Sequence, residues 1–429
     1  MLLTRRTVWA LTFSLAFLAA ATSRADLPNV RLVLDEMERA VLAGDAEAYL
    51  AHVAADDPIF HREQQMWAAD LKRHRPVEFM LTVSEEEPAG SAEPEAPKDA
   101  AKPGDAREGD APARSVFAPA FGPERATFML KMSWRMGDDV DEPGRKLREV
   151  KYPVEFVRTD GRWLYRGELW DAVERPADET TGFHGVRVRF PLDSGLDAPA
   201  KLAADLMPGI RSRVDELFGL KITRVQEVKL YSSMLHLQAS IYLSYTDGLG
   251  GWNEPHESVK ILSRGRTREA QLKNLLGHEY GHVATFELMP DSDQQPWWLL
   301  EGLADFAAGH VTTSDPAGPS GGEGRGANRR VLAWHKAGKL AEWNQMADFR
   351  KTPNELMGHV YKQGEHFVRW FSRTFGDAAR NTWVRLLGSG KTLDEASVAV
   401  TAKTFAELDT AWRESVGKLA QEQKPDGEE

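Results

Sequence analysis

Residues 275–286 read LLGHEYGHVATF and carry two histidines four positions apart, with a glutamate directly after the first. On an α-helix, residues four apart lie on one face, so His278 and His282 can direct imidazole nitrogens at a single point. Glu279 projects about 100° further around the axis, where its carboxylate could act on a metal-bound water without being a ligand. Such a string also arises by chance in roughly a few per cent of chains, so the motif needs support from other residues.

That support comes from Glu301, which follows His282 with eighteen residues between them. This spacing allows one helix to end, the chain to turn, and a carboxylate to lie on the next helix. Two histidines and a glutamate with an open fourth position are typical of catalytic rather than structural zinc. Asp305, one helical turn beyond Glu301, could accept a hydrogen bond from a ligating histidine, for which we expect His278.

The residues therefore predict one zinc ion held by His278, His282 and Glu301. Two surface histidines with an ion-paired glutamate would explain residues 278–282, but not the spacing of Glu301 and Asp305. A domain that binds zinc without hydrolysing anything stays open at this stage.

The string HEYGH, followed after eighteen residues by EGLAD, resembles the gluzincin metallopeptidases, which include thermolysin and the zinc aminopeptidases. PWWL at 296–299, VYKQGEHFVRWFSRTFG at 360–376 and LDTAW at 408–412 are similar to bacterial peptidase-MA-like domains of that clan. The resemblance covers residues 185–418. It implies a zinc peptidase with Glu279 as general base, and a strand before the active helix that holds an extended substrate. ESVKILSRG, residues 257–265, corresponds to that strand.

The resemblance also implies a hydroxyl donor to the developing oxyanion. In the zinc aminopeptidases this donor is a tyrosine well downstream of the glutamate ligand, and Tyr361, sixty residues after Glu301, is the corresponding residue. His359 and His366 compete with Tyr361 for this role, and packing of Tyr361 in a helical core is the alternative.

The sequence leaves open whether the enzyme would bind the amino terminus of a substrate or cleave within a peptide. The aminopeptidases hold the free amine of the substrate with a Gly-x-Met-Glu-Asn stretch, whereas this chain has GWNEPHES at 251–258. Glu254 or Glu257 could anchor an amine, but the departure from the family pattern makes an open cleft for internal cleavage an equal alternative.

The first 25 residues have the pattern of a secretion signal. Arg5 and Arg6 precede a mostly apolar run from Val8 to Ala21, which is shorter than the ~20 residues needed to cross a bilayer. We therefore expect export to the periplasm or the exterior, by the general or the twin-arginine route, and no stable membrane span after signal removal. The chain has no cysteine, so metal ligands must come from His, Asp or Glu.

The length of the chain predicts the number of domains, and its charge limits the classes of partner. A chain of 429 residues predicts two or three domains. Its net charge of −11 opposes binding to nucleic acid, so a peptide or protein substrate is the expected partner. The charge does not predict an oligomeric state.

Residues 26–172 read as short helices followed by strands, with a turn at Asp160-Gly161. This order resembles the cone-shaped nuclear-transport-factor-2-like domain. An insert at 86–115, rich in Ala, Pro, Glu and Asp, predicts disorder. Acidic and histidine side chains that could line a pocket in the cone, or simply face solvent, are Asp56, Asp57, His61 and Glu63.

Residues 185–420 form the second predicted domain. We expect strands at 185–191, 221–233, 235–245 and 257–265, and a helix closed by Gly219. A helix capped by Thr267 should run to Leu288, a second should start at Pro296, and four or five more should precede a disordered tail at 421–429. The predicted fold class is α+β: cone-like helices with an antiparallel sheet, then a gluzincin-type domain with a mixed sheet and a helical C-terminal part.

Two functional hypotheses follow. The first is an exported zinc metallopeptidase that uses Glu279 as general base. The second is a non-catalytic, zinc-containing envelope binding protein that uses the N-terminal pocket.

Overall fold

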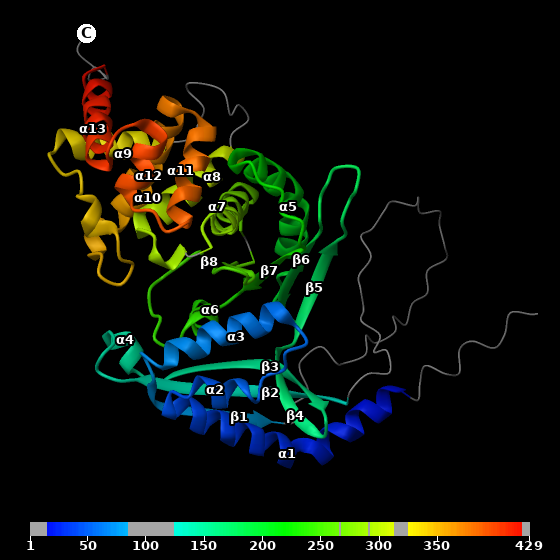
Figure 1. The fold of residues 1–429 in the computed structure, drawn as a ribbon. Helices are drawn as coiled ribbons and strands as arrows, with labels where there is room; N and C mark the ends of the chain where they lie inside the picture. Colours follow the sequence, from blue (N-terminus) through cyan, green and yellow to red (C-terminus); the bar gives the residue numbers. More distant parts are fainter. Residues whose placement is uncertain (1–14, 85–123, 266, 291, 313–324, 423–429) are drawn as a thin grey trace, which may run out of the picture.

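The computed structural model describes residues 15–84, 124–265, 267–290, 292–312 and 325–422. The predicted insert at 86–115, residues 1–14 of the predicted signal, and residues 423–429 of the predicted tail lie outside these ranges. Within them, the chain forms an N-terminal unit, α1–α4 with β1–β4, and a C-terminal unit that runs from β5 to α13 (Figure 1).

The N-terminal unit begins with helices whose starts are fixed by aspartate caps. Asp45 accepts a hydrogen bond from the Ala48 amide, and Asp57 accepts from the amides of Ile59 and Phe60. These contacts satisfy amides that the first turn of a helix leaves unpaired. The helices are α1 (Leu15–Ala43), α2 (Ala46–Leu50), α3 (Pro58–Leu71) and the short α4 (Glu142–Arg145).

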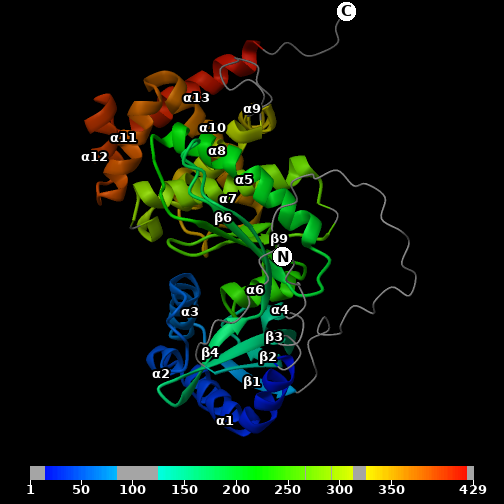
Figure 2. The same cartoon turned by 90° about the vertical axis from the view of Figure 1, so that its right-hand side faces the viewer.

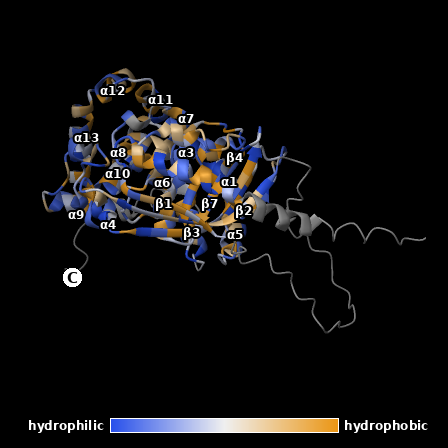
Figure 3. Cartoon of the chain, turned by 90° about the horizontal axis from the view of Figure 1, so that it is seen from below, coloured by the Kyte–Doolittle hydropathy of each residue, from blue (hydrophilic) through white to orange (hydrophobic). Residues whose placement is uncertain are grey.

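An antiparallel sheet with the order β1-β2-β3-β4 completes this unit. Its strands are β1 (Pro76–Ser84), β2 (Arg125–Met136), β3 (Arg148–Thr159) and β4 (Arg162–Glu168). The predicted hairpin turn is present, with Asp160 and Gly161 at φ 51° and 78°. Buried residues alternate with more exposed ones along β4, so that one face of the sheet is buried. Figure 3 shows hydrophobic and hydrophilic residues interspersed along the chain.

A second, mixed sheet belongs to the C-terminal unit and has the order β5-β6-β7-β9-β8. Its strands are β5 (Trp170–Arg175), β6 (Val186–Pro191), β7 (Gln226–Tyr231), β8 (Gly251–Trp252) and β9 (Val259–Leu262). β6, β7 and β9 are parallel, whereas β5 and β8 run antiparallel to their neighbours. The chain ends its pairing with the first sheet at Glu168 and enters the second sheet at Trp170.

The prediction of a strand at 235–245 is wrong, because residues Met234–Ile241 form helix α6. Ser233 caps this helix, since its hydroxyl accepts a hydrogen bond from the His236 amide. A short apolar run fits a buried helix as well as a strand, so the local cap decided the outcome. Thr267 is likewise not a cap: α7 (Glu269–Leu288) starts after Arg268.

The remaining helices build most of the C-terminal unit (Figure 2). α5 (Asp197–Phe218) ends at Gly219 in the left-handed conformation, as predicted. α8 (Trp297–Thr312) follows Pro296. The five helices at the C-terminal end are α9 (Arg325–Lys336), α10 (Met357–Phe375), α11 (Asp377–Gly388), α12 (Leu393–Thr401) and α13 (Phe405–Glu422). Within the described ranges, each helix is too short or too polar to cross a membrane.

The α+β fold class is thus confirmed, with helices and an antiparallel sheet first and a mixed sheet with a helical region second. The two units meet through buried polar contacts. Trp67 on α3 donates its indole N–H to the Ala239 carbonyl at 3.1 Å, and Trp134 on β2 donates to the Leu243 carbonyl at 3.1 Å. Because buried indole donors need acceptors, these bonds fix α6 against the N-terminal unit.

Candidate metal centre

Three side chains converge where α7 lies beside α8. Glu301 Oε2 is 3.2 Å from His278 Nε2 and 3.5 Å from His282 Nε2. In the part of the chain that the structure describes, this is the one group of three or more such side chains that could hold a metal ion, and its ligand atoms lie within 4.8 Å of one another. The structure therefore brings together the three residues that the spacing in the sequence indicated.

The orientation of Glu301 suits a cation. Trp297 Nε1 donates to Glu301 Oε1 at 2.9 Å, which turns the other oxygen, Oε2, toward the two imidazoles. That oxygen is buried and accepts no hydrogen bond from the described residues. A buried carboxylate oxygen with no donor, facing two imidazole nitrogens, is a set of ligands that fits zinc.

Asp305 lies behind His278, as predicted. Its Oδ1 is 2.9 Å from His278 Nδ1, so it can hold the ring with Nε2 directed at the centre. Its other oxygen accepts from Lys362 Nζ at 2.7 Å. Lys362 also donates to Glu365, and Glu365 accepts from Arg369 at 2.7 Å. A chain of alternating charges therefore runs from His278 along α10.

His282 is held differently. Its Nδ1 is buried and has no hydrogen-bond partner among the described residues. Its ring instead stacks on Phe286, one turn further along α7, with centroids 5.8 Å apart and planes 17° apart. Packing therefore restrains His282, whereas an ion pair restrains His278.

Glu279 is buried beside the outer strand of the second sheet. Its side chain is in close contact with Gly251 on β8, and the residue is only 4% exposed. Burial raises the pKa of Glu279 above its ordinary value, although the two histidines oppose the shift. A carboxylate with a raised pKa can more readily both take and return a proton near neutral pH.

Tyr361 on α10 is the one of the three proposed oxyanion donors that lies near the centre. Its ring is 6.0 Å from that of His278. His359 instead contacts the Lys339 carbonyl at 3.0 Å, and His366 accepts from Trp412 Nε1 at 2.9 Å. Burial, together with the charge of Glu301, raises the pKa of Tyr361, so its hydroxyl keeps its proton and can donate it in a hydrogen bond.

α8 and α10 touch main chain to main chain at Gly302 and Gly364. A Cβ on Gly302 would lie 2.6 Å from the carbonyl carbon of Gly364, so no larger residue fits without separating the helices. This crossing sets the separation of Glu301 and Asp305 on one helix from Tyr361 on the other.

Sequence reasoning missed a row of aromatic rings beside the centre, which we call the aromatic wall. Phe349 joins its members: its ring is 5.0 Å from Trp297, 6.1 Å from Trp252 and 6.0 Å from Tyr245. These residues come from four separate segments, so no local pattern could have grouped them. The charge chain Lys362–Glu365–Arg369, by contrast, has helical spacing that could have been recognised.

The strand predicted to bind substrate needs correction. β9, within 257–265, pairs with β7 on one side and β8 on the other, so the outer strand next to β9 is β8. On this side of the sheet a peptide could add only along β8, because an inner strand has no free edge. Glu257 is buried, and its carboxylate accepts from Lys260 at 2.8 Å, so it is already paired within the protein.

The four residues proposed to line a pocket in the N-terminal unit do not share one site. Asp56 pairs with Arg166 at 2.9 Å, and Asp57 pairs with Arg189 at 3.1 Å besides capping α3. His61 is only partly buried. Of the four, Glu63 lines a cavity, to whose wall Lys229 of β7 also belongs.

No family model and no curated protein matches the sequence. Among solved structures, the chain is similar to an M1 zinc metallopeptidase from Deinococcus radiodurans, with 14% identity and a TM-score of 0.36. A mutant of that enzyme bound to a Tyr-Ser-Ala substrate gives 12% identity and a TM-score of 0.37. In both comparisons, 67% of this chain covers 62% of the other, less than two thirds of its length.

Proposed function

We propose that this protein is an exported zinc-dependent metallopeptidase that hydrolyses peptide bonds with Glu279 as general base. The observation that carries the proposal is the convergence of His278, His282 and Glu301 on one point, with Asp305 behind His278. Glu279, buried and directly after His278 in the sequence, supplies the remaining group that hydrolysis needs.

When bound, zinc would act as a Lewis acid that makes water more acidic and polarises the substrate carbonyl. Glu279 accepts the proton of the attacking water and later gives it to the nitrogen of the leaving amine. The hydroxyl of Tyr361 donates to the carbonyl oxygen as negative charge develops there. Trp297 keeps Glu301 turned toward the histidines, and Asp305 keeps His278 in one ring orientation.

The decisive experiment measures zinc content and peptide hydrolysis on the same purified samples. We expect about one zinc per chain in the wild type and in Glu279→Gln, because Glu279 is not a ligand. Hydrolysis of a mixed peptide library should fall by about 10²- to 10⁴-fold in Glu279→Gln. Glu269→Gln is the matched control, since this glutamate lies on the same helix but is exposed at its first turn.

A wild type without zinc, or a Glu279→Gln variant as active as the wild type, would reject the proposal. Mass spectrometry of the cut sites would also show whether the enzyme removes terminal residues or cleaves within peptides.

The alternative is a zinc-containing envelope protein that binds a ligand without hydrolysis. It is favoured by a cavity between the two units, whose lining does not include the metal centre. This alternative predicts that zinc remains while no peptide in the library is cut by wild type or variant.

Export is the part of the proposal that rests on residues 1–25 alone. N-terminal sequencing of the protein recovered from a bacterial envelope fraction should find the mature chain beginning near Asp26. Recovery of an intact chain from the cytoplasm alone would count against export, and would leave the proposed chemistry unaffected.

A further inference from the structure

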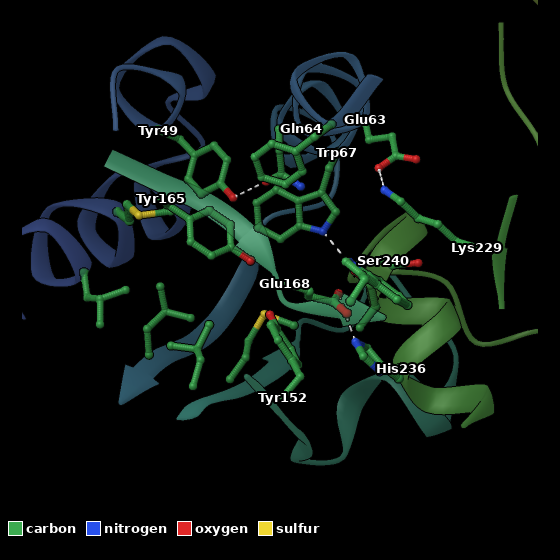
Figure 4. Close-up of a pocket in the computed structure, with 18 of the residues that line it drawn as sticks. Tyr49, Glu63, Gln64, Trp67, Tyr152, Tyr165, Glu168, Lys229, His236 and Ser240 are labelled. Carbon is green, nitrogen blue, oxygen red and sulfur yellow. Dashed lines mark hydrogen bonds and ion pairs between the residues drawn. The ribbon is translucent and has the colours of Figure 1, made fainter. Parts of the chain in front are cut away.

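A cavity of about 70 Å³ lies between the two units, away from the metal centre (Figure 4). The N-terminal unit supplies most of its wall, from α1, α2, α3 and the first sheet. β5, β7 and α6 of the C-terminal unit supply the rest, including Trp170, Tyr231 and His236. The cavity is therefore complete only when the two units are docked.

The wall has an apolar part and a polar part. The apolar part includes Leu34, Met37, Leu130 and Met132. The polar part contains tyrosine hydroxyls and the amide of Gln64, and Figure 4 shows Tyr49 directed at this amide. A space with this division suits a molecule that is apolar at one end and hydrogen-bonded at the other.

Every carboxylate in the wall already has a basic neighbour. Glu63 accepts from Lys229 Nζ at 2.5 Å, and both residues are at least 94% buried. Glu168 Oε1 lies 3.0 Å from His236 Nε2. A charged ligand would find no free counter-ion here, and an unpaired buried charge is strongly unfavourable. The ligand is therefore neutral.

The side chain of Gln64 offers a donor to the cavity. Its amide oxygen is occupied, because Tyr49 donates to Gln64 Oε1 at 2.6 Å. The Gln64 amide nitrogen, however, makes no hydrogen bond to any residue that the structure describes. Because this nitrogen carries two N–H groups, a ligand oxygen with free lone pairs is the complementary group.

Size limits the ligand further. A water molecule needs about 10–15 Å³ of such a cavity, so 70 Å³ accommodates about five to seven nonhydrogen atoms. Met37 and Met132 are flexible and can adjust to an irregular shape. We propose that this cavity is a binding site for a small neutral molecule, largely apolar, with one carbonyl or hydroxyl oxygen that accepts a hydrogen bond from Gln64.

The test is an NMR titration of the full chain, labelled at its methionine methyl groups, with cyclopentanone as the probe. We expect saturable shifts of the Met37 and Met132 signals with a dissociation constant in the millimolar range or tighter. The Met207 signal is the internal control, since Met207 is buried in the separate core of the C-terminal unit and should not move. Cyclopentylammonium and cyclopentanecarboxylate, which are charged, should bind at least tenfold more weakly.

Two variants complete the test. Gln64→Leu keeps the shape of the wall but removes the donor, so it should weaken cyclopentanone binding about tenfold. Leu130→Phe should fill the cavity and abolish the shifts; if it does not fold, Gln64→Leu still decides the matter. Absence of saturable shifts, equal binding of the charged probes, or unchanged binding by Gln64→Leu would overturn the proposal. None of these results depends on whether the metal centre cleaves peptides.

Discussion

Gly251 on β8 lies directly against the carboxylate of Glu279 on α7. A Cβ at position 251 would lie 2.8 Å from Glu279 Cδ, a distance that carbon atoms do not tolerate without displacement. The outer strand of the second sheet and the proposed general base therefore occupy positions that depend on each other.

Gly251→Ala should accordingly move Glu279 or separate β8 from it. Because a displacement of about 1 Å at a reacting group can reduce a rate about 100-fold, we expect kcat to fall by about that factor while zinc content is retained. Gly248→Ala is the matched control, since a Cβ there would meet no atom within 4 Å. Equal kcat values for the two variants would show that this contact does not position the base.

Tyr361→Phe tests the proposed oxyanion donor. Removal of one such donor should lower kcat by about 10²- to 10³-fold with little change in KM, because the bond strengthens only as charge develops. Tyr245→Phe serves for comparison: burial also raises the pKa of Tyr245, with a contribution from Glu301, but its ring belongs to the aromatic wall. Steady-state kinetics in which Tyr245→Phe loses more activity than Tyr361→Phe would transfer the role to Tyr245.

Asp305→Asn should weaken zinc binding. An asparagine keeps the shape but loses the negative charge that orients His278 and balances Lys362, so we expect a 10- to 100-fold loss of affinity. Competition with a chelator of known affinity measures this directly. Asp409→Asn, on the distant α13 and paired with Trp343 and Arg413, controls for the general effect of losing an aspartate. If the variant bound zinc as tightly as the wild type does, Asp305 would have no role in zinc binding.

Glu63 predicts a specific loss of stability in acid. Burial alone would raise its pKa, but the ammonium groups of Lys229 and Lys260 outweigh this and lower the pKa of Glu63 to about 2. Since the folded-state pKa lies below the ordinary value of 4.5, the stabilisation is complete above about pH 5 and is lost as the pH falls toward 2. It amounts to something on the order of 3 kcal/mol.

Thermal unfolding of wild type and Glu63→Gln between pH 3 and pH 7 measures this contribution. The difference in Tm should be constant above about pH 5 and should shrink below it. Glu155→Gln is a suitable control, because Glu155 pairs with Arg125 and Arg166 inside the N-terminal unit and does not bridge the two units. A difference between wild type and Glu63→Gln that does not change with pH would contradict the prediction.

The convergence of the candidate metal ligands could be predicted from the sequence because its geometry is largely local. His278 and His282 share one helix, and Glu301 and Asp305 share the next, so the helical repeat and one short connection determine their positions. The segment 235–245 could not be predicted, since its apolar spacing fits helix and strand alike and the Ser233 cap decides between them.

Contacts between segments far apart in the sequence could not be predicted either. Glu63 meets Lys229 across 166 residues of sequence, and the aromatic wall joins rings from four segments. Such pairs follow from how the two units dock, and periodicity carries no information about docking. The same reason explains why β8, only two residues long, was not recognised as the outer strand.

The contact of Gly302 with Gly364 has a consequence for the protein before any ion arrives. With no side chains between α8 and α10 at that point, the two backbones cannot slide past each other without losing their closest van der Waals contact. Gly281 on α7 packs as closely on α8, since a Cβ there would lie 3.0 Å from the Ala304 Cα. The proposed ligands on α7 and α8 should therefore already be arranged in the metal-free protein, and zinc uptake should require little ordering of the chain. Zinc would then bind to a preformed site, as a metal ion binds to a rigid macrocyclic ligand, whereas a zinc finger folds only when zinc binds.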